Sequence, residues 1–254
     1  NNWTELIAAE LGLSARCAAQ KGLDGLGGSA QFTVMPPTNQ AGCLNYAQGG
    51  ARVTESKGPG NKALEFTPTG GSSNGYATLG QLTVPLVTQV ANHFTATART
   101  TFAGTELITV AGGANDVFTQ LQVLQALGGG NTAIALAAGW TGADLVAVGG
   151  GTSATALAVT KMGTAGTELA NLVKNEMVAK GAKYILVATI PDMAQTPFGL
   201  SQDAGTRALI GSMVTTFNTN LKAGLAGAAG VVVVDAYAAN QDQIANPGQH
   251  GLTN

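Results

Sequence analysis

Two short stretches hold the residue types best suited to act on a substrate, and both combine glycine with a carboxamide. They read Asn45-Tyr46-Ala47-Gln48-Gly49-Gly50-Ala51 and Gly112-Gly113-Ala114-Asn115-Asp116. A glycine has no Cβ and tolerates positive φ, so its main chain can approach a ligand closely. The amide of Asn115 can donate a hydrogen bond to a substrate oxygen without adding a charge. These types suit a site that stabilises an oxygen atom, but Asn115 can also cap a helix and the glycine pair can form an ordinary turn.

The position of Asn115 in the chain favours a binding site. It follows the apolar run 107–111, which is typical of a strand buried on both faces. Apolar residues at helical spacing come next, over 117–127. The unit is therefore strand, glycine turn and helix, and in a parallel sheet such a turn at the carboxyl end of a strand is where ligands bind.

Similar strands and helices follow along the rest of the chain. Two further buried strands are predicted at 184–190 and 231–234, and each is followed by an aspartate, Asp192 or Asp235. Helices are predicted over 4–11, 82–94, 168–180 and 206–225. This alternation predicts one α/β domain over 1–254 with a mainly parallel sheet.

The segments between these elements are poor in hydrophobic pattern. Residues 14–42 are expected to be irregular, and 54–80 to form a polar, glycine-rich loop. Residues 128–165 are predicted to be an Ala/Gly-rich helical insertion.

Composition excludes several classes of function. Charged residues make up 10% of the 254 residues and the net charge is −2, which argues against a nucleic-acid partner. No apolar run reaches eighteen residues, so no transmembrane segment is predicted. A nucleotide-binding α/β protein is a further alternative, but the glycine-rich phosphate-binding motifs are absent. The many glycines and few charges are typical of a secreted or periplasmic bacterial protein.

The two cysteines and two histidines limit the chemistry further. Cys17 and Cys43 are expected to form a disulfide in an oxidising compartment, the alternative being two free thiols in a reducing one. With no C-x-x-C pair and two histidines, neither a metal site nor a cofactor is predicted. His93 is predicted to be a surface or helix-end residue rather than a catalytic base, and His250 a surface residue.

Taken in order, three stretches resemble the GDSL, or SGNH, hydrolases. The stretch from Asn45 to Ala51 resembles the second sequence block of this family, and Gly113-Ala114-Asn115-Asp116 matches the third block, G-x-N-D. A later segment also resembles the family, Ile190-Pro191-Asp192-Met193 followed by Thr196-Pro197. Weaker likeness at 2–6 and 246–254 extends the resemblance nearly from end to end.

The resemblance implies a fold and a reaction. The fold would be flavodoxin-like, a three-layer α/β/α arrangement around a mainly parallel sheet. The reaction would be hydrolysis of a small-molecule or lipid ester by a serine nucleophile and a histidine base held by an aspartate. Carried over by motif, Gly49 and Asn115 are the oxyanion-hole donors, Asp116 is a cap or support, and Gly50 serves packing. We expect a monomer.

The family's nucleophile and base have no counterpart in the sequence. None of the serines follows Gly-Asp, and no aspartate stands three residues before either histidine. The resemblance places these blocks before Asn1 and after Asn254, so we expect an interior portion of a longer hydrolase, truncated at both ends. The alternative is a catalytically inactive binding or surface module on the same fold.

Overall fold

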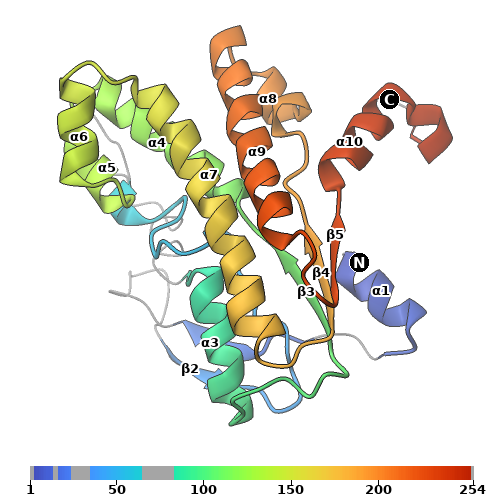
Figure 1. The fold of residues 1–254 in the computed structure, drawn as a ribbon. Coiled ribbons are helices and arrows are strands. Elements are labelled where there is room, and N and C mark those ends of the chain that lie inside the picture. The colour runs from blue at the N-terminus through green and yellow to red at the C-terminus, as the bar shows by residue number, and fades with distance from the viewer. Residues whose placement is uncertain (1–2, 14–16, 24–34, 65–82, 253–254) are drawn as a thin grey trace.

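The centre of the fold is a parallel sheet of three strands. The computed structural model describes residues 3–13, 17–23, 35–64 and 83–252. Within them β3 (Leu107–Ala111), β4 (Tyr184–Ala188) and β5 (Val231–Val234) pair in the order β3-β4-β5 (Figure 1). Ile185 of β4 lies opposite Ile108 on one side and Val231 on the other. The predicted mixed α/β class with a parallel sheet is confirmed.

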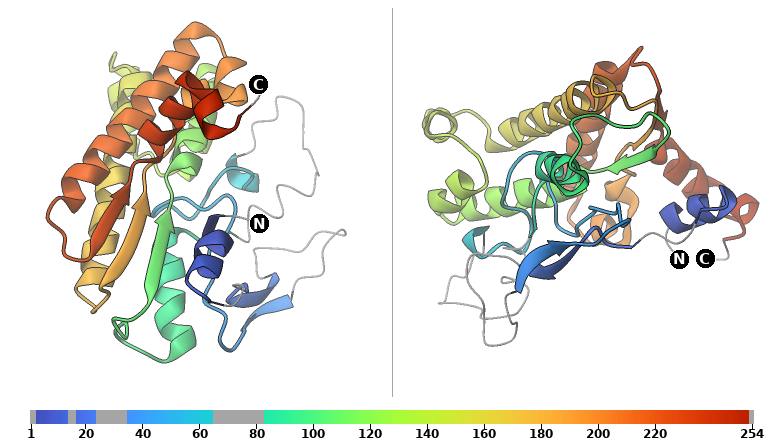
Figure 2. Two further views of the ribbon diagram at one scale, coloured as in Figure 1. Left: turned by 90° about the vertical axis from the view of Figure 1, so that its right-hand side faces the viewer. Right: turned by 90° about the horizontal axis from the view of Figure 1, so that it is seen from below.

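Two long helices cover one face of this sheet. They are α7 (Ala154–Leu172) and α9 (Ala204–Leu225), which lie side by side in both views of Figure 2. Ser153 and Asp203 cap their N-termini with side-chain oxygens. A Cβ on Gly166 of α7 would overlap the backbone of Phe217, so a glycine there allows the two helices to approach closely.

The remaining elements are shorter and surround this unit. They are α1 (Trp3–Glu10), β1 (Gln20–Leu23), β2 (Met35–Asn39), η1 (Lys62–Leu64), α3 (Leu86–Thr97), α4 (Ala114–Gly128), α5 (Thr132–Ala137), α6 (Gly142–Gly149), η2 (Val173–Val178), η3 (Met193–Gln195), α8 (Pro197–Leu200), α10 (Ala236–Ala245) and η4 (Pro247–His250). Figure 2 places α1 and α10 away from α7 and α9, across the sheet.

The strands are buried on one face only, so the prediction of burial on both faces is wrong. On the face toward α7 and α9, Ile185 and Val187 are buried. On the opposite face Tyr184 is 58% exposed and Val232 is 57% exposed. Strand sequence cannot tell these cases apart, because coverage of the second face depends on elements distant in sequence.

Several predicted boundaries are corrected. Residues 154–165, assigned to the insertion, form the first part of α7, where Met162 is buried against α9. The helix predicted at 168–180 therefore starts at Ala154 and ends in the π-helical turn η2. The helix predicted over 82–94 is α3, which begins after Pro85.

The N-terminal region is more ordered than predicted. Within 14–42, β1 and β2 pair antiparallel, with Gln20 opposite Asn39. Cys17 and Cys43 are joined by a disulfide, with 5.0 Å between their Cα atoms. Most of the loop predicted at 54–80 lies outside the described residues. No helix in the described part of the chain has both the length and the hydropathy needed to span a bilayer.

Candidate functional site

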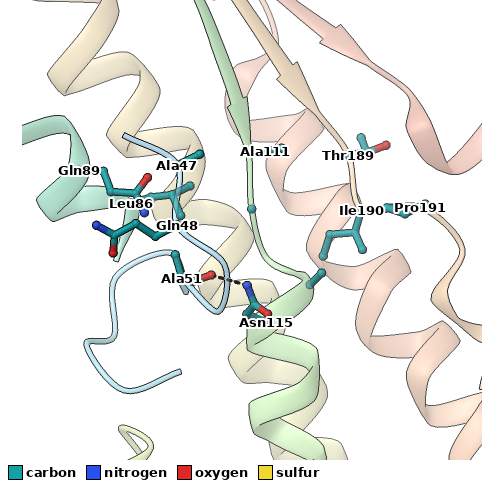
Figure 3. A pocket seen from close by; sticks show the side chains of 12 residues that line it. Ala47, Gln48, Ala51, Leu86, Gln89, Ala111, Asn115, Thr189, Ile190 and Pro191 are labelled. Atoms are coloured by element: carbon teal, nitrogen blue, oxygen red, sulfur yellow. Dashed lines mark hydrogen bonds between the residues drawn. The ribbon is translucent and has the colours of Figure 1, made fainter. Parts of the chain in front are cut away.

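A cavity of about 230 Å³ lies at the carboxyl ends of β3 and β4 (Figure 3). Its lining residues come from the 45–53 loop, the start of α3, the β3–α4 turn and the end of β4. They are Ala47, Gln48, Ala51, Leu86, Gln89, Ala111, Gly112, Ala114, Asn115, Thr189, Ile190 and Pro191. The cavity is thus where the glycine turn predicted a ligand site.

Asn115 reaches the cavity because the turn before it is tight. Gly113 has φ 102°, and a Cβ there would meet Ile190 Cδ1 at 2.9 Å and overlap the ring of Phe217. Gly113 is also the residue that precedes the first turn of α4, and Asn115 lies inside the helix. Helix capping, the alternative role for Asn115, is therefore not what its side chain does.

The amide of Asn115 is held in one orientation. Its Nδ2 donates to the carbonyl oxygen of Ala51 over 2.8 Å, which is the dashed line in Figure 3. A carboxamide nitrogen has two hydrogens, and the second has no acceptor among the described residues, which leaves it to a ligand. The bond also ties Asn115 to the loop that carries Gly49.

That loop is fixed to the N-terminus of α3. The Arg52 carbonyl accepts from the Leu86 N–H at 3.0 Å, and the Gln48 Oε1 accepts from the Val84 N–H at 2.8 Å. Gly50 has φ 84°, so its role is conformational, beyond the packing role expected from the resemblance. The loop therefore has a defined path beside the cavity.

Gly49 is near the cavity but does not line it. It stands between Gln48 and Gly50, and its carbonyl accepts from the Thr83 hydroxyl at 3.1 Å. Among the described residues its N–H has no hydrogen-bond acceptor, and a Cβ at Gly49 would meet no atom. The structure therefore places Asn115 in the cavity and leaves the Gly49 N–H beside it, free of described partners.

A buried ion pair lies beneath the cavity. Arg52 Nε is 2.8 Å from Asp116 Oδ1, and the two residues are 4% and 2% exposed. Arg52 Nη1 also donates to the carbonyl oxygens of Ala138 and Lys57, and Asp116 Oδ2 accepts from the Val53 N–H. Burial raises the pKa of Asp116, and the Arg52 guanidinium opposes that rise. Asp116 thus supports the loop through the Val53 N–H, and Arg52 is its ion-pair partner.

Arg52 was missed by sequence reasoning. The only signal in the sequence is a charged residue between two apolar ones, Ala51 and Val53. Its partner Asp116 is 64 residues away in the chain, so the pairing could not be found from local pattern.

His93 was predicted to be a surface or helix-end residue; the helix-end position is confirmed and the surface position is wrong. It lies near the end of α3 and is 9% exposed, with its ring stacked on Phe102 at 5.0 Å and edge-on to Tyr46 at 5.6 Å. Burial lowers the pKa of His93. The negative charge of Glu106 opposes this shift, and the positive charge of Arg99 adds to it. Neither ring nitrogen reaches the cavity of Figure 3, which His93 does not line.

The other strand-end and terminal residues serve local structure. Asp192 and Asp235 accept hydrogen bonds from the backbone at the starts of η3 and α10. His250 Nε2 is 2.8 Å from Asp242 Oδ2 on an exposed part of the C-terminal region, in agreement with the surface position predicted for it.

The cavity offers neutral donors and no charge. Asn115, Gln48 and Gln89 supply amides, the Thr189 hydroxyl already donates to Val234 or Asp235, and no ionisable side chain of the described residues lines the cavity. None of the serines in the described part of the chain lines it either. The described residues also contain no group of three His, Cys, Asp or Glu side chains able to hold a metal. This arrangement can bind and polarise an uncharged oxygen-containing group.

Comparison with known proteins adds no evidence on the chemistry of this site. No protein-family model matches the chain. A search of curated proteins likewise finds no significant match.

Proposed function

We propose that the protein is a carboxylic ester hydrolase of the SGNH type, with Asn115 and Gly49 as donors of its oxyanion hole. One observation carries the proposal: the Asn115 amide stands in a neutral cavity at the carboxyl end of the sheet, tied at 2.8 Å to the loop that carries Gly49. On this proposal the sheet belongs to a flavodoxin-like, three-layer fold. The disulfide between Cys17 and Cys43 supports a secreted or periplasmic location.

The proposed reaction divides the work between two sets of residues. A serine outside the 254 residues attacks the ester carbonyl, and a histidine, also outside them, takes the serine proton and returns it to the leaving alcohol. The negative charge that develops on the carbonyl oxygen accepts hydrogen bonds from the second N–H of Asn115 and from the Gly49 N–H. Both donors are neutral and held by the backbone around them, so they need little reorganisation when the charge appears.

Substitution of Asn115 tests this assignment. In the full-length protein Asn115→Ala is expected to lower kcat for p-nitrophenyl esters by roughly a hundredfold or more, because one oxyanion donor is lost. Asn131→Ala is the matched control, since that side chain caps no helix and lies away from the cavity lining. A loss of kcat below about fivefold for Asn115→Ala would refute the role of Asn115.

The second candidate is a non-catalytic binding module on the same fold. The observation that favours it is that none of the described serines lines the cavity. A fluorophosphonate probe separates the two candidates, because it reacts only with an activated serine. Labelling of the full-length protein rules out the module, and absence of labelling together with absence of ester hydrolysis rules out the hydrolase.

A further inference from the structure

Among the described residues, no charged side chain lines the cavity beside Asn115. All twelve lining residues are neutral, and eight of them are alanine, glycine, leucine, isoleucine or proline. The nearest cation of the loop, Arg52, is buried and already bound to Asp116 and to two carbonyl oxygens. A carboxylate brought into this cavity would lose its hydration and gain amide donors but no cation, which costs a large part of its binding free energy.

Leu86 forms one wall of the cavity. In Figure 3 it lies with Ala47 and Gln48 on the side opposite Ile190. It is the first residue of α3 and is 8% exposed. A Cβ on Gly112 would lie 2.7 Å from Leu86 Cδ2, so the side chain rests directly on the β3–α4 turn.

Hydrogen bonding holds the main chain of this wall in place. The Leu86 N–H donates to the Arg52 carbonyl at 3.0 Å, and Arg52 is anchored by its buried ion pair. A substrate group extending from the Asn115 amide toward α3 therefore meets the Leu86 side chain, whose main chain is held in place. The size of that side chain limits the space.

We propose that the cavity selects esters with a short, uncharged acyl group and that Leu86 sets the limit on acyl length. This inference rests on the proposed ester hydrolase function and names the substrate class of the same site. Leu86 acts as a specificity-determining residue and takes no part in the chemical step.

The test compares acyl chains on the full-length protein. A series of p-nitrophenyl esters from acetate to dodecanoate gives kcat/KM as a function of acyl length. The p-nitrophenyl monoester of succinic acid, compared with the butyrate ester, measures the effect of a carboxylate at similar length. The wild-type protein is expected to prefer short acyl groups and to hydrolyse the succinate monoester roughly a hundredfold less efficiently.

Leu86→Ala removes three carbon atoms from the wall and is expected to move the preferred acyl length upward. The ratio of kcat/KM for hexanoate to that for acetate is expected to rise about tenfold. Leu86→Val, a milder change, is expected to act in the same direction if the alanine variant does not fold. Leu221→Ala is the matched control, because Leu221 is fully buried in α9 and does not line the cavity.

The outcomes separate this inference from the proposed function. A shift in acyl preference with either Leu86 variant, absent in Leu221→Ala, together with poor hydrolysis of the succinate monoester, supports the inference. Ester hydrolysis with an unchanged length profile, or with equal activity on the charged ester, overturns the inference and leaves the hydrolase standing. Absence of both hydrolysis and fluorophosphonate labelling overturns the hydrolase and the inference with it.

Discussion

Replacement of Arg52 by methionine would remove the cation that balances Asp116 in the interior. The methionine fills much of the same volume but donates no hydrogen bond. Of its described partners Asp116 would keep the Val53 N–H at 3.2 Å, and the carbonyl oxygens of Ala138 and Lys57 would lose their shared donor. Arg52 and Asp116 are 4% and 2% exposed, so water would replace these partners only in part.

The expected cost follows from this burial. Removing one partner of a buried ion pair typically costs about 3–5 kcal/mol of unfolding free energy. In Arg52→Met/Asp116→Leu no charge remains, and the main loss is the Val53 N–H without an acceptor, which costs about 1–3 kcal/mol. The double variant is therefore expected to be more stable than Arg52→Met by about 2 kcal/mol.

Urea unfolding at neutral pH measures these differences. Arg99→Met is the matched control, because the Arg99 side chain is 53% exposed in its ion pair with Glu106 and its loss is expected to cost under about 1 kcal/mol. The reasoning fails if Arg52→Met costs no more than Arg99→Met, or if the double variant is less stable than Arg52→Met.

The same pair predicts the pH dependence of stability. Burial raises the pKa of Asp116, so the folded protein retains this proton at a pH where the unfolded chain, with a pKa of about 4, has lost it. The stability due to this carboxyl is fully present below about pH 4 and is lost as pH rises through its raised folded pKa. Asp116→Asn is expected to flatten the profile of unfolding free energy above that pH, and an unchanged profile would contradict burial of this carboxyl as the cause.

Three further predictions concern other parts of the fold. Burial lowers the pKa of His93, so the stability that this residue contributes is present above about pH 6.5 and is lost as pH falls through the folded pKa. His93→Phe is expected to remove this acid-dependent loss of unfolding free energy, measured by urea unfolding at stepwise lower pH. An identical acid profile in the variant and the wild-type protein would contradict the prediction. Val232→Thr on the exposed sheet face is expected to change the unfolding free energy by less than about 0.5 kcal/mol. Val187→Thr on the buried face is expected to lower it by about 1–3 kcal/mol. Equal costs would mean that both faces of the sheet are covered. Replacing both Cys17 and Cys43 by serine is expected to lower the unfolding free energy by at most about 3.5 kcal/mol, because the disulfide closes a loop with a separation of 26 residues. Thermal unfolding measures this change, and a wild-type Tm insensitive to reductant would argue against the disulfide in solution.

Sequence predicted the elements that local pattern defines. The starts of β3, β4 and β5 agree with the predicted strands, because apolar runs bounded by glycine or polar residues are local signals. The long helix α9 was predicted within two residues of its observed start, since Ile210, Met213 and Phe217 recur at helical spacing and all are buried.

Features that depend on distant partners were not predictable. Whether Val232 is buried depends on which elements cover its face of the sheet, and that is decided outside the strand. His93 is buried because Tyr46 and Phe102, outside its own helix, surround its ring. Arg52 is buried because a carboxylate 64 residues away neutralises it. A single charged or polar residue looks alike in sequence whether it is solvated or paired.

Asn115 shows how a local motif takes its role from a distant one. By itself a polar residue after a glycine pair predicts a helix cap, yet Gly113 occupies the position before the helix and the Asn115 amide turns to the Ala51 carbonyl. Asp116, the next residue, binds the Val53 N–H and Arg52 on the same loop. Two adjacent side chains of α4 thus hold both sides of the 51–53 backbone. Because Gly49 lies on this loop, the distance between the two proposed oxyanion donors is set by contacts of both stretches, and a change at Arg52 should alter it without touching either donor.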